Sequence, residues 1–168
     1  MTSAYHGGTS PGSPIHIPQH DQSDDSEIRI TEGELKADIA TIKTGTLTIS
    51  LPGVAMWRKA LPILENLSPA TVLIAFDADW RSNTHVAKAL VACAATINKA
   101  GFDLVVETWE PSHGKGLDDL LANGEQPERR GIAAAYAAKM RGATQQKRHS
   151  LRDWVKPGAP ARGLLCRE

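Results

Sequence analysis

The sequence predicts an α/β fold in which a mostly parallel sheet of about four strands carries helices on both faces. Strand-like and helix-like segments alternate between residues 27 and 124. The segment ATVLIAF, residues 70–76, is a continuous apolar run, as expected for a strand that is buried on both faces. The segment 82–101 has helical periodicity, an N-cap at Ser82 or Asn83 and a terminal Gly. Alternation of this kind is typical of parallel sheets.

The first elements in the chain are a strand, a helix and a second strand. Residues 28–31 alternate weakly and are predicted to form a short strand. A helix is predicted to follow, because apolar residues recur at helical spacing, and Gly45 is its C-terminal stop. These apolar residues are Leu35, Ile39 and Ile42. Residues 46–50, TLTIS, are β-branched and predict the second strand.

The later elements repeat the alternation. Residues 55–67 are predicted to be helical, with Pro62 bending the helix or starting a second piece. The strand at 70–76 and the helix at 82–101 come next, and residues 102–109, FDLVVETW, form another strand. A loop and the short helix LDDLLANG, which ends at Gly124, complete the series.

Composition divides the chain into three parts. Residues 1–26 are rich in Gly, Pro, Ser and His without periodicity and are expected to be disordered. Residues 27–124 form the α/β domain. Residues 125–168 are expected to be a basic helix and tail, because they hold ten Lys and Arg against four Asp and Glu, whereas residues 1–124 hold nine against fifteen.

The basic tail makes DNA or RNA an expected partner, and a solvated helix with a frayed end is the alternative. The residues proposed to contact phosphates are Arg129, Arg130, Lys147 and Arg148.

Several classes of protein do not fit the sequence. The two cysteines, Cys93 and Cys166, match no zinc-binding spacing. No basic segment followed by an apolar stretch marks a signal peptide, and no apolar run reaches the roughly 18 residues of a membrane span. A cytoplasmic protein without a membrane partner is therefore expected.

Acidic residues follow several of the predicted strands. Glu32 follows the first strand, and Asp77 and Asp79 follow the third. Asp118 and Asp119 come after the loop that leaves the last strand. Because parallel strands point the same way, these carboxylates are expected to gather at one edge of the sheet, where ligands bind in such folds.

A divalent cation would relieve the repulsion between these carboxylates. Oxygen ligands favour Mg²⁺, with Mn²⁺ as an alternative, and leave room for a phosphate group. Gly33 permits close approach to Glu32, and Lys115 offers a positive charge to a phosphate.

Each acidic residue also has a simpler interpretation. Asp-x-Asp after a strand is common in loops. Glu32, Asp118 and Asp119 can each stabilise the start of a helix through its dipole. The shared edge, rather than any one motif, favours a metal site.

The motifs resemble a known family. ITEGELKAD followed about forty residues later by VLIAFDADW is similar to the Toprim domain of topoisomerases, bacterial primases and related nucleases. More closely, EGELKAD, SLPGVAMW, AFDADW and GKGLDDLL resemble a Toprim-like domain of unknown function. That domain accompanies primase and helicase modules in phage and plasmid replication proteins. The resemblance covers residues 27–124.

The resemblance implies a Toprim-like, Rossmann-like fold with Glu32 as general acid or base and Asp77 and Asp79 as Mg²⁺ ligands. Lys115, Asp118 and Asp119 match its last block, whose role the resemblance does not fix. Neither a zinc module nor a Gly-x4-Gly-Lys-Ser/Thr phosphate loop is present, so an isolated module or a fragment of a larger replication protein is expected.

Three functions are compatible with these residues. The first is Mg²⁺-dependent phosphoryl or nucleotidyl transfer on nucleic acid, as a nucleotidyltransferase or nuclease. The second is a non-catalytic module that binds nucleic acid or a partner and keeps a vestigial acidic pocket. The third is a haloacid-dehalogenase-type phosphatase, which is disfavoured because that family carries Asp-x-Asp after its first strand and favours Thr or Val where Arg81 stands.

Overall fold

The computed structural model describes residues 14–19 and 26–134 of the 168-residue chain. They form an α/β fold with a five-stranded, mostly parallel sheet. The strands are β1 (Glu27–Glu32), β2 (Thr48–Leu51), β3 (Thr71–Ile74), β4 (Asp103–Thr108) and β5 (Glu128–Arg130). The helices are α1 (Glu34–Thr44), α2 (Leu61–Leu67), α3 (Thr84–Lys99) and α4 (Leu117–Ala122), with short 3₁₀ helices η1 (Val54–Ala60), η2 (Ala78–Arg81) and η3 (Pro111–His113).

The strand order is β2-β1-β3-β4-β5. The first four strands in this sheet are parallel, as predicted, and β5 is antiparallel to β4. The segment that contains β5 was predicted to be helical; among its described residues, 128–130 form a strand and 132–134 are helical, and the part after residue 134 lies outside the described residues. The three residues of β5, ERR, carry no apolar pattern, so the sheet rather than local preference determines their conformation.

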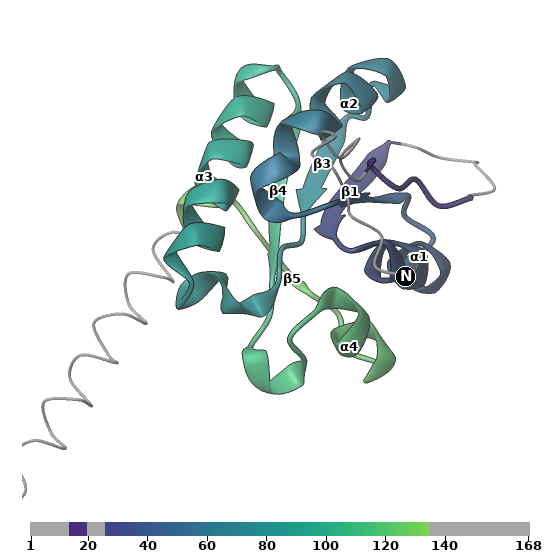
Figure 1. Ribbon diagram of the computed structural model, residues 1–168, viewed down its shortest axis with the longest axis vertical. Helices are drawn as coiled ribbons and strands as arrows, with labels where there is room; N and C mark the ends of the chain where they lie inside the picture. Colours follow the sequence, from purple (N-terminus) through teal and green to yellow (C-terminus); the bar gives the residue numbers. More distant parts are fainter. Residues whose placement is uncertain (1–13, 20–25, 135–168) are drawn as a thin grey trace, which may run out of the picture.

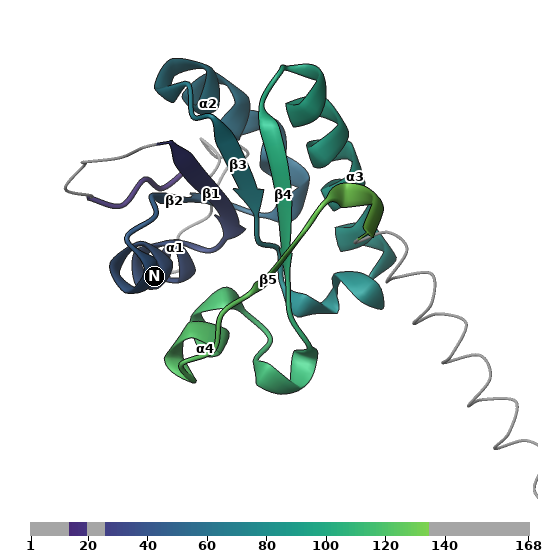
Figure 2. The same cartoon turned by 180° about the vertical axis from the view of Figure 1, so that it is seen from behind.

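Helices lie on both faces of the sheet (Figures 1 and 2). On one face, η1, α2 and α3 enclose the larger hydrophobic core, which includes Cys93. Alternate strand residues supply that core, among them Ile28, Ile30, Ile49, Leu51, Val72 and Ile74. On the other face, α1 and α4 contact each other, and a smaller cluster joins Ala40 and Ala75 to leucines of α4. Among the described residues, no helix is both long and apolar enough to cross a bilayer.

The orientation of α1 differs from the one its sequence suggests. Ala37, Ala40 and Thr41 are its buried residues, whereas Leu35 is 66% exposed and Ile42 is 81% exposed. Small side chains on the inner side let the helix approach a sheet face that is itself polar. The apolar periodicity of α1 therefore predicted the helix correctly but not the side that is buried.

The polar face of the sheet contains a buried ion pair between β1 and β4. Arg29 donates from Nε to Glu107 Oε2 at 2.6 Å, and from a second nitrogen to Oε1 at 3.2 Å. Both side chains are almost fully buried, at 3% and 1% exposure. Two threonine hydroxyls, Thr44 Oγ1 at 3.0 Å and Thr48 Oγ1 at 3.2 Å, accept the remaining hydrogen bonds of the guanidinium group. The pair links two strands that β3 separates.

Both outer strands of the sheet have further contacts. At one edge, His16 forms an antiparallel bridge with Ser50 of β2, and its ring lies 2.7 Å from Asp38 of α1. His16 belongs to the segment that was expected to be disordered. At the other edge, Arg129 of β5 donates to both carboxylate oxygens of Glu27, at 2.9 and 2.8 Å.

Candidate functional site

The strand order places β1 and β3 next to each other in the middle of the sheet. From β1 the chain moves outwards to β2 and then returns across β1 to β3, so the strand order reverses between these two strands. In open α/β sheets the crevice beyond the carboxyl ends of such strands is the usual ligand site. Glu32 is the last residue of β1, and Asp77 and Asp79 follow the end of β3.

A pocket of about 360 Å³ opens at this position. It brings together residues from the ends of β1 and β3, from the turn before η1, from the first turn of α3 and from the loop before α4. Its polar lining consists of Glu32, Asp77, Asp79, Asn83, His85 and Lys115. The three acidic residues predicted to share one edge therefore line one pocket.

Glu32 is held where the chain turns from β1 into α1. Gly33 adopts a φ of 95°, a conformation that favours glycine, and its N–H donates to Leu51 O at 3.2 Å. Burial raises the pKa of Glu32, and the negative charges of Asp77 and Asp79 raise it further, while Lys36 and Lys115 oppose the shift. The protonated form of this carboxyl group is therefore favoured relative to an exposed glutamate, which suits a proton-transfer role.

Asp77 is the more buried of the two aspartates and forms an ion pair. Its residue exposure is 8%, and its Oδ1 accepts a hydrogen bond from Lys36 Nζ of α1. The carbonyl of Asp77 accepts from Trp80 N at 3.1 Å, which begins the η2 turn. That turn carries Asp79 back towards the pocket.

Asp79 has one carboxylate oxygen without a partner. Its Oδ1 is buried and has no hydrogen bond, whereas Oδ2 accepts from Asn83 Nδ2 at 3.4 Å. Asn83 also caps α3, because its Oδ1 accepts from His85 N at 3.1 Å and Val86 N at 3.4 Å. Asn83 therefore connects the orientation of Asp79 to the start of α3.

The residues of the GKGLDD block have different positions. Lys115 lines the pocket, and its carbonyl accepts from Ala78 N at 3.0 Å. Asp119 accepts from the N–H groups of Lys115 at 3.2 Å and Gly116 at 3.0 Å, so it caps the start of α4. Asp118 Oδ1 is buried without a partner, close to Gly116.

Two site residues were missed from the sequence. Lys36 lies in the first turn of α1, the helix that follows Glu32, and its Nζ reaches Asp77 at the end of β3. His85 is exposed and also lines the pocket. The signals that identify them are a place in the first turn of the helix after Glu32 and a place in the first turn of the helix that Asn83 caps.

Within residues 14–19 and 26–134, no three His, Cys, Asp or Glu side chains are arranged to hold a metal ion by themselves. Mg²⁺ is commonly bound through one or two carboxylates, with water and substrate phosphates as further ligands. The unpartnered Oδ1 of Asp79 and the repulsion that raises the pKa of Glu32 fit a cation there.

The basic residues proposed to contact nucleic acid are only partly described. Arg129 is paired with Glu27, and its Nε lies 3.5 Å from Glu107 Oε1. Arg130 donates to its neighbour Glu128 from Nε at 2.9 Å. Both guanidinium groups therefore have acidic partners within the sheet. Lys147 and Arg148 lie outside the described residues.

Fold and pocket together define an α/β domain with an acidic site at the strand reversal of a parallel sheet. The chain belongs to the family described as Domain of unknown function (DUF3854), which matches residues 21–127. That match spans β1 to α4 and ends just before β5. No curated protein and no solved structure matches the chain.

Proposed function

We propose that this domain is a Mg²⁺-dependent phosphoryl- or nucleotidyl-transfer module that acts on nucleic acid in a primase-like replication protein of a mobile element. One observation carries the proposal: Glu32, Asp77 and Asp79 line a single pocket at the strand reversal. The resemblance of EGELKAD and AFDADW to the Toprim domain supports the same chemistry and supplies the nucleic-acid substrate.

Each side chain has a role in this proposal. Asp79, with its unpartnered Oδ1, and Asp77 would hold Mg²⁺, or Mn²⁺ in its place. When bound, the metal ion supplies stabilisation of negative charge on the transferred phosphate. Glu32 moves a proton to or from the attacking or leaving oxygen, and its raised pKa suits that role. Lys115 places a positive charge at the pocket wall for a phosphate oxygen.

A second candidate is a non-catalytic module that binds nucleic acid or a replication partner. The ion pair between Lys36 and Asp77 favours it, because it neutralises part of the acidic pocket without a metal ion. The two candidates differ in whether the pocket binds a divalent cation and whether Glu32 is needed for a reaction.

Mg²⁺ titration followed by thermal melting of the full chain tests the metal site. At a hundredfold excess over its dissociation constant, Mg²⁺ is expected to stabilise the parent by about 2.7 kcal/mol. Replacing Asp77 and Asp79 together by Asn should abolish this gain. Asp103→Asn is the matched control, because Asp103 is an exposed acid at the opposite, amino end of β4. A parent whose melting temperature ignores Mg²⁺ would favour the non-catalytic candidate.

Glu32→Gln tests the chemistry separately. Cleavage and primer synthesis are measured on single-stranded and double-stranded DNA and RNA, with primase or helicase modules supplied as partners. The substitution should lower the rate by roughly 10²–10⁴-fold while metal binding stays within a few-fold of the parent. Full activity in this variant would remove Glu32 from the mechanism.

A further inference from the structure

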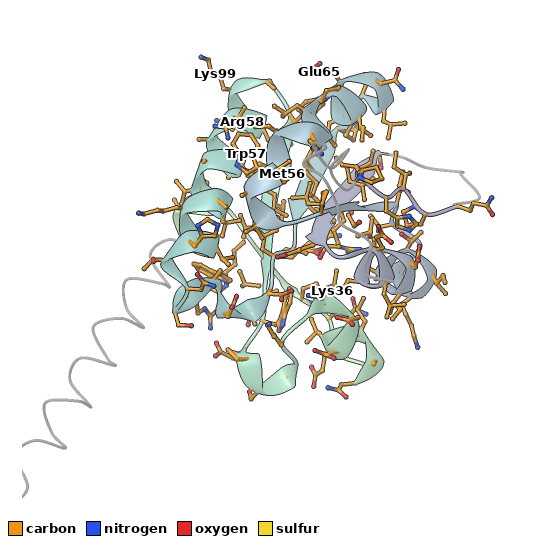
Figure 3. The ribbon with its side chains drawn as sticks, in the orientation of Figure 1. Lys36, Met56, Trp57, Arg58, Glu65 and Lys99 are labelled. Carbon is orange, nitrogen blue, oxygen red and sulfur yellow. The ribbon has the colours of Figure 1, made fainter. Side chains whose placement is uncertain are left out.

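Lys36 is a cation built into the acidic pocket. It projects from the first turn of α1, and its Nζ donates to Asp77 Oδ1. The two side chains are 23% and 12% exposed, so water screens this pair less than a surface pair. Figure 3 shows Lys36 between α1 and α4.

The N-cap of α4, Gly116, lies against this lysine. A Cβ added at Gly116 would come within 2.8 Å of Lys36 Cε and 3.2 Å of its Nζ, and it would overlap Asp118 Oδ1. Gly116 has an ordinary φ of −95°, so no unusual backbone conformation calls for glycine there. A larger residue at Gly116 would displace the ends of the Lys36 and Asp118 side chains.

The carboxylates of the pocket are neutralised unevenly. Asp77 has Lys36 as its partner, whereas Asp79 Oδ1 has none. Three carboxylates and the ammonium groups of Lys36 and Lys115 leave a formal charge of minus one, so a single divalent ion already more than neutralises the pocket. A second divalent ion beside Lys36 would place an excess of positive charge in a partly buried pocket.

We infer that the pocket takes one divalent metal ion, held chiefly by Asp79 and shared by Asp77, and that the Lys36 ammonium group on Asp77 Oδ1 occupies the position of a second. The inference rests on the proposed function, in which a phosphate group then lies between the metal ion and Lys36. Sites with two metal ions use the pair, about 3.5–4 Å apart, to stabilise both the attacking and the leaving oxygen. Here Lys36 supplies the second charge as a fixed side chain.

The test is the number of Mn²⁺ ions bound by the full chain, measured by calorimetry and by electron paramagnetic resonance. The parent is expected to bind one Mn²⁺. Lys36→Met should bind two, with spin coupling between them, because removing the ammonium group opens a second cation position on Asp77. Lys36→Arg and Lys115→Met are the controls and should each bind one. The first keeps the charge, and the second removes the other lysine of the pocket, for whose side chain no ion pair is found among the described residues.

Each outcome decides the inference. Two Mn²⁺ ions in the parent, or one in a folded Lys36→Met variant, would overturn it and leave the proposed function standing. If Lys36→Met does not fold, Lys36→Gln, which also removes the ammonium charge, is measured in its place with the same expected and contradicting results. No Mn²⁺ bound by the parent would remove both this inference and the metal-dependent function.

Discussion

Replacing Glu107 by Ala should destabilise the fold more than any other removal of one charge described above. The substitution leaves the Arg29 guanidinium group in a position that is only 3% exposed, with two threonine hydroxyls as its remaining partners. Loss of one member of a buried ion pair costs about 3–5 kcal/mol, because the other charge stays buried without compensation. For a domain of this size, that loss lowers the melting temperature by roughly 10 °C or more.

Urea denaturation followed by circular dichroism measures this free energy of unfolding. Glu110→Ala is the matched control, because it removes a carboxylate from the exposed pair with Arg81, whose side chains are 24% and 64% exposed. That change should cost under about 1 kcal/mol. A double variant, Arg29→Met with Glu107→Leu, should recover most of the loss, because no charge is then left unpaired. Equal losses in Glu107→Ala and Glu110→Ala would refute the reasoning.

Two further predictions concern other parts of the fold. Burial raises the pKa of Cys93 to about 12, so in a Cys166→Ser background the native protein should react with iodoacetamide at pH 8 roughly 10³-fold more slowly than the urea-unfolded chain; comparable rates would contradict a buried thiol. Gly114 and Gly124 both have positive φ, 141° and 76°. A Cβ added at Gly114 would lie 2.5 Å from Asp119 Cβ, whereas a Cβ added at Gly124 would have no described atom within 4 Å. Gly124→Ala should therefore cost about 1 kcal/mol and Gly114→Ala at least twice that in urea denaturation, and a smaller loss at Gly114 would count against the tight turn before α4.

The sequence predicted the four parallel strands because each has an apolar or β-branched pattern and a neighbouring helix. It did not predict β5, since ERR has neither property and is held by pairing with β4. The buried side of α1 was not predictable either. Leu35 and Ile42 follow the periodicity of a core-facing helix, yet this helix packs through Ala37 and Ala40. The sheet face that α1 covers is polar because it contains the ion pair of Arg29 and Glu107, which are 78 residues apart in sequence. Local periodicity cannot reveal such a face, and small residues of α1 pack against it.

The candidate site was predictable as far as backbone direction determines it. Glu32, Asp77 and Asp79 share an edge because β1 and β3 are parallel neighbours. Side-chain partners were not predictable from direction alone. A lysine side chain has four rotatable bonds, so the position of Lys36 in the sequence predicts the region that its ammonium group can reach but not that it pairs with Asp77. Asp119 differs from these residues, because its carboxylate accepts hydrogen bonds at the start of α4 and this capping role accounts for its position.

The two outer strands have a consequence for how the protein behaves at high concentration. An unpaired strand edge is a template for intermolecular sheet growth, and native proteins block it with short strands, charges or covering segments. Here His16 pairs with Ser50 along β2, and β5 closes the opposite side with three residues whose arginines are held by acids. A shortened chain that begins at residue 26 or ends at residue 127 would expose the edge of β2 or β4. Such a chain would retain its acidic pocket while becoming prone to self-association.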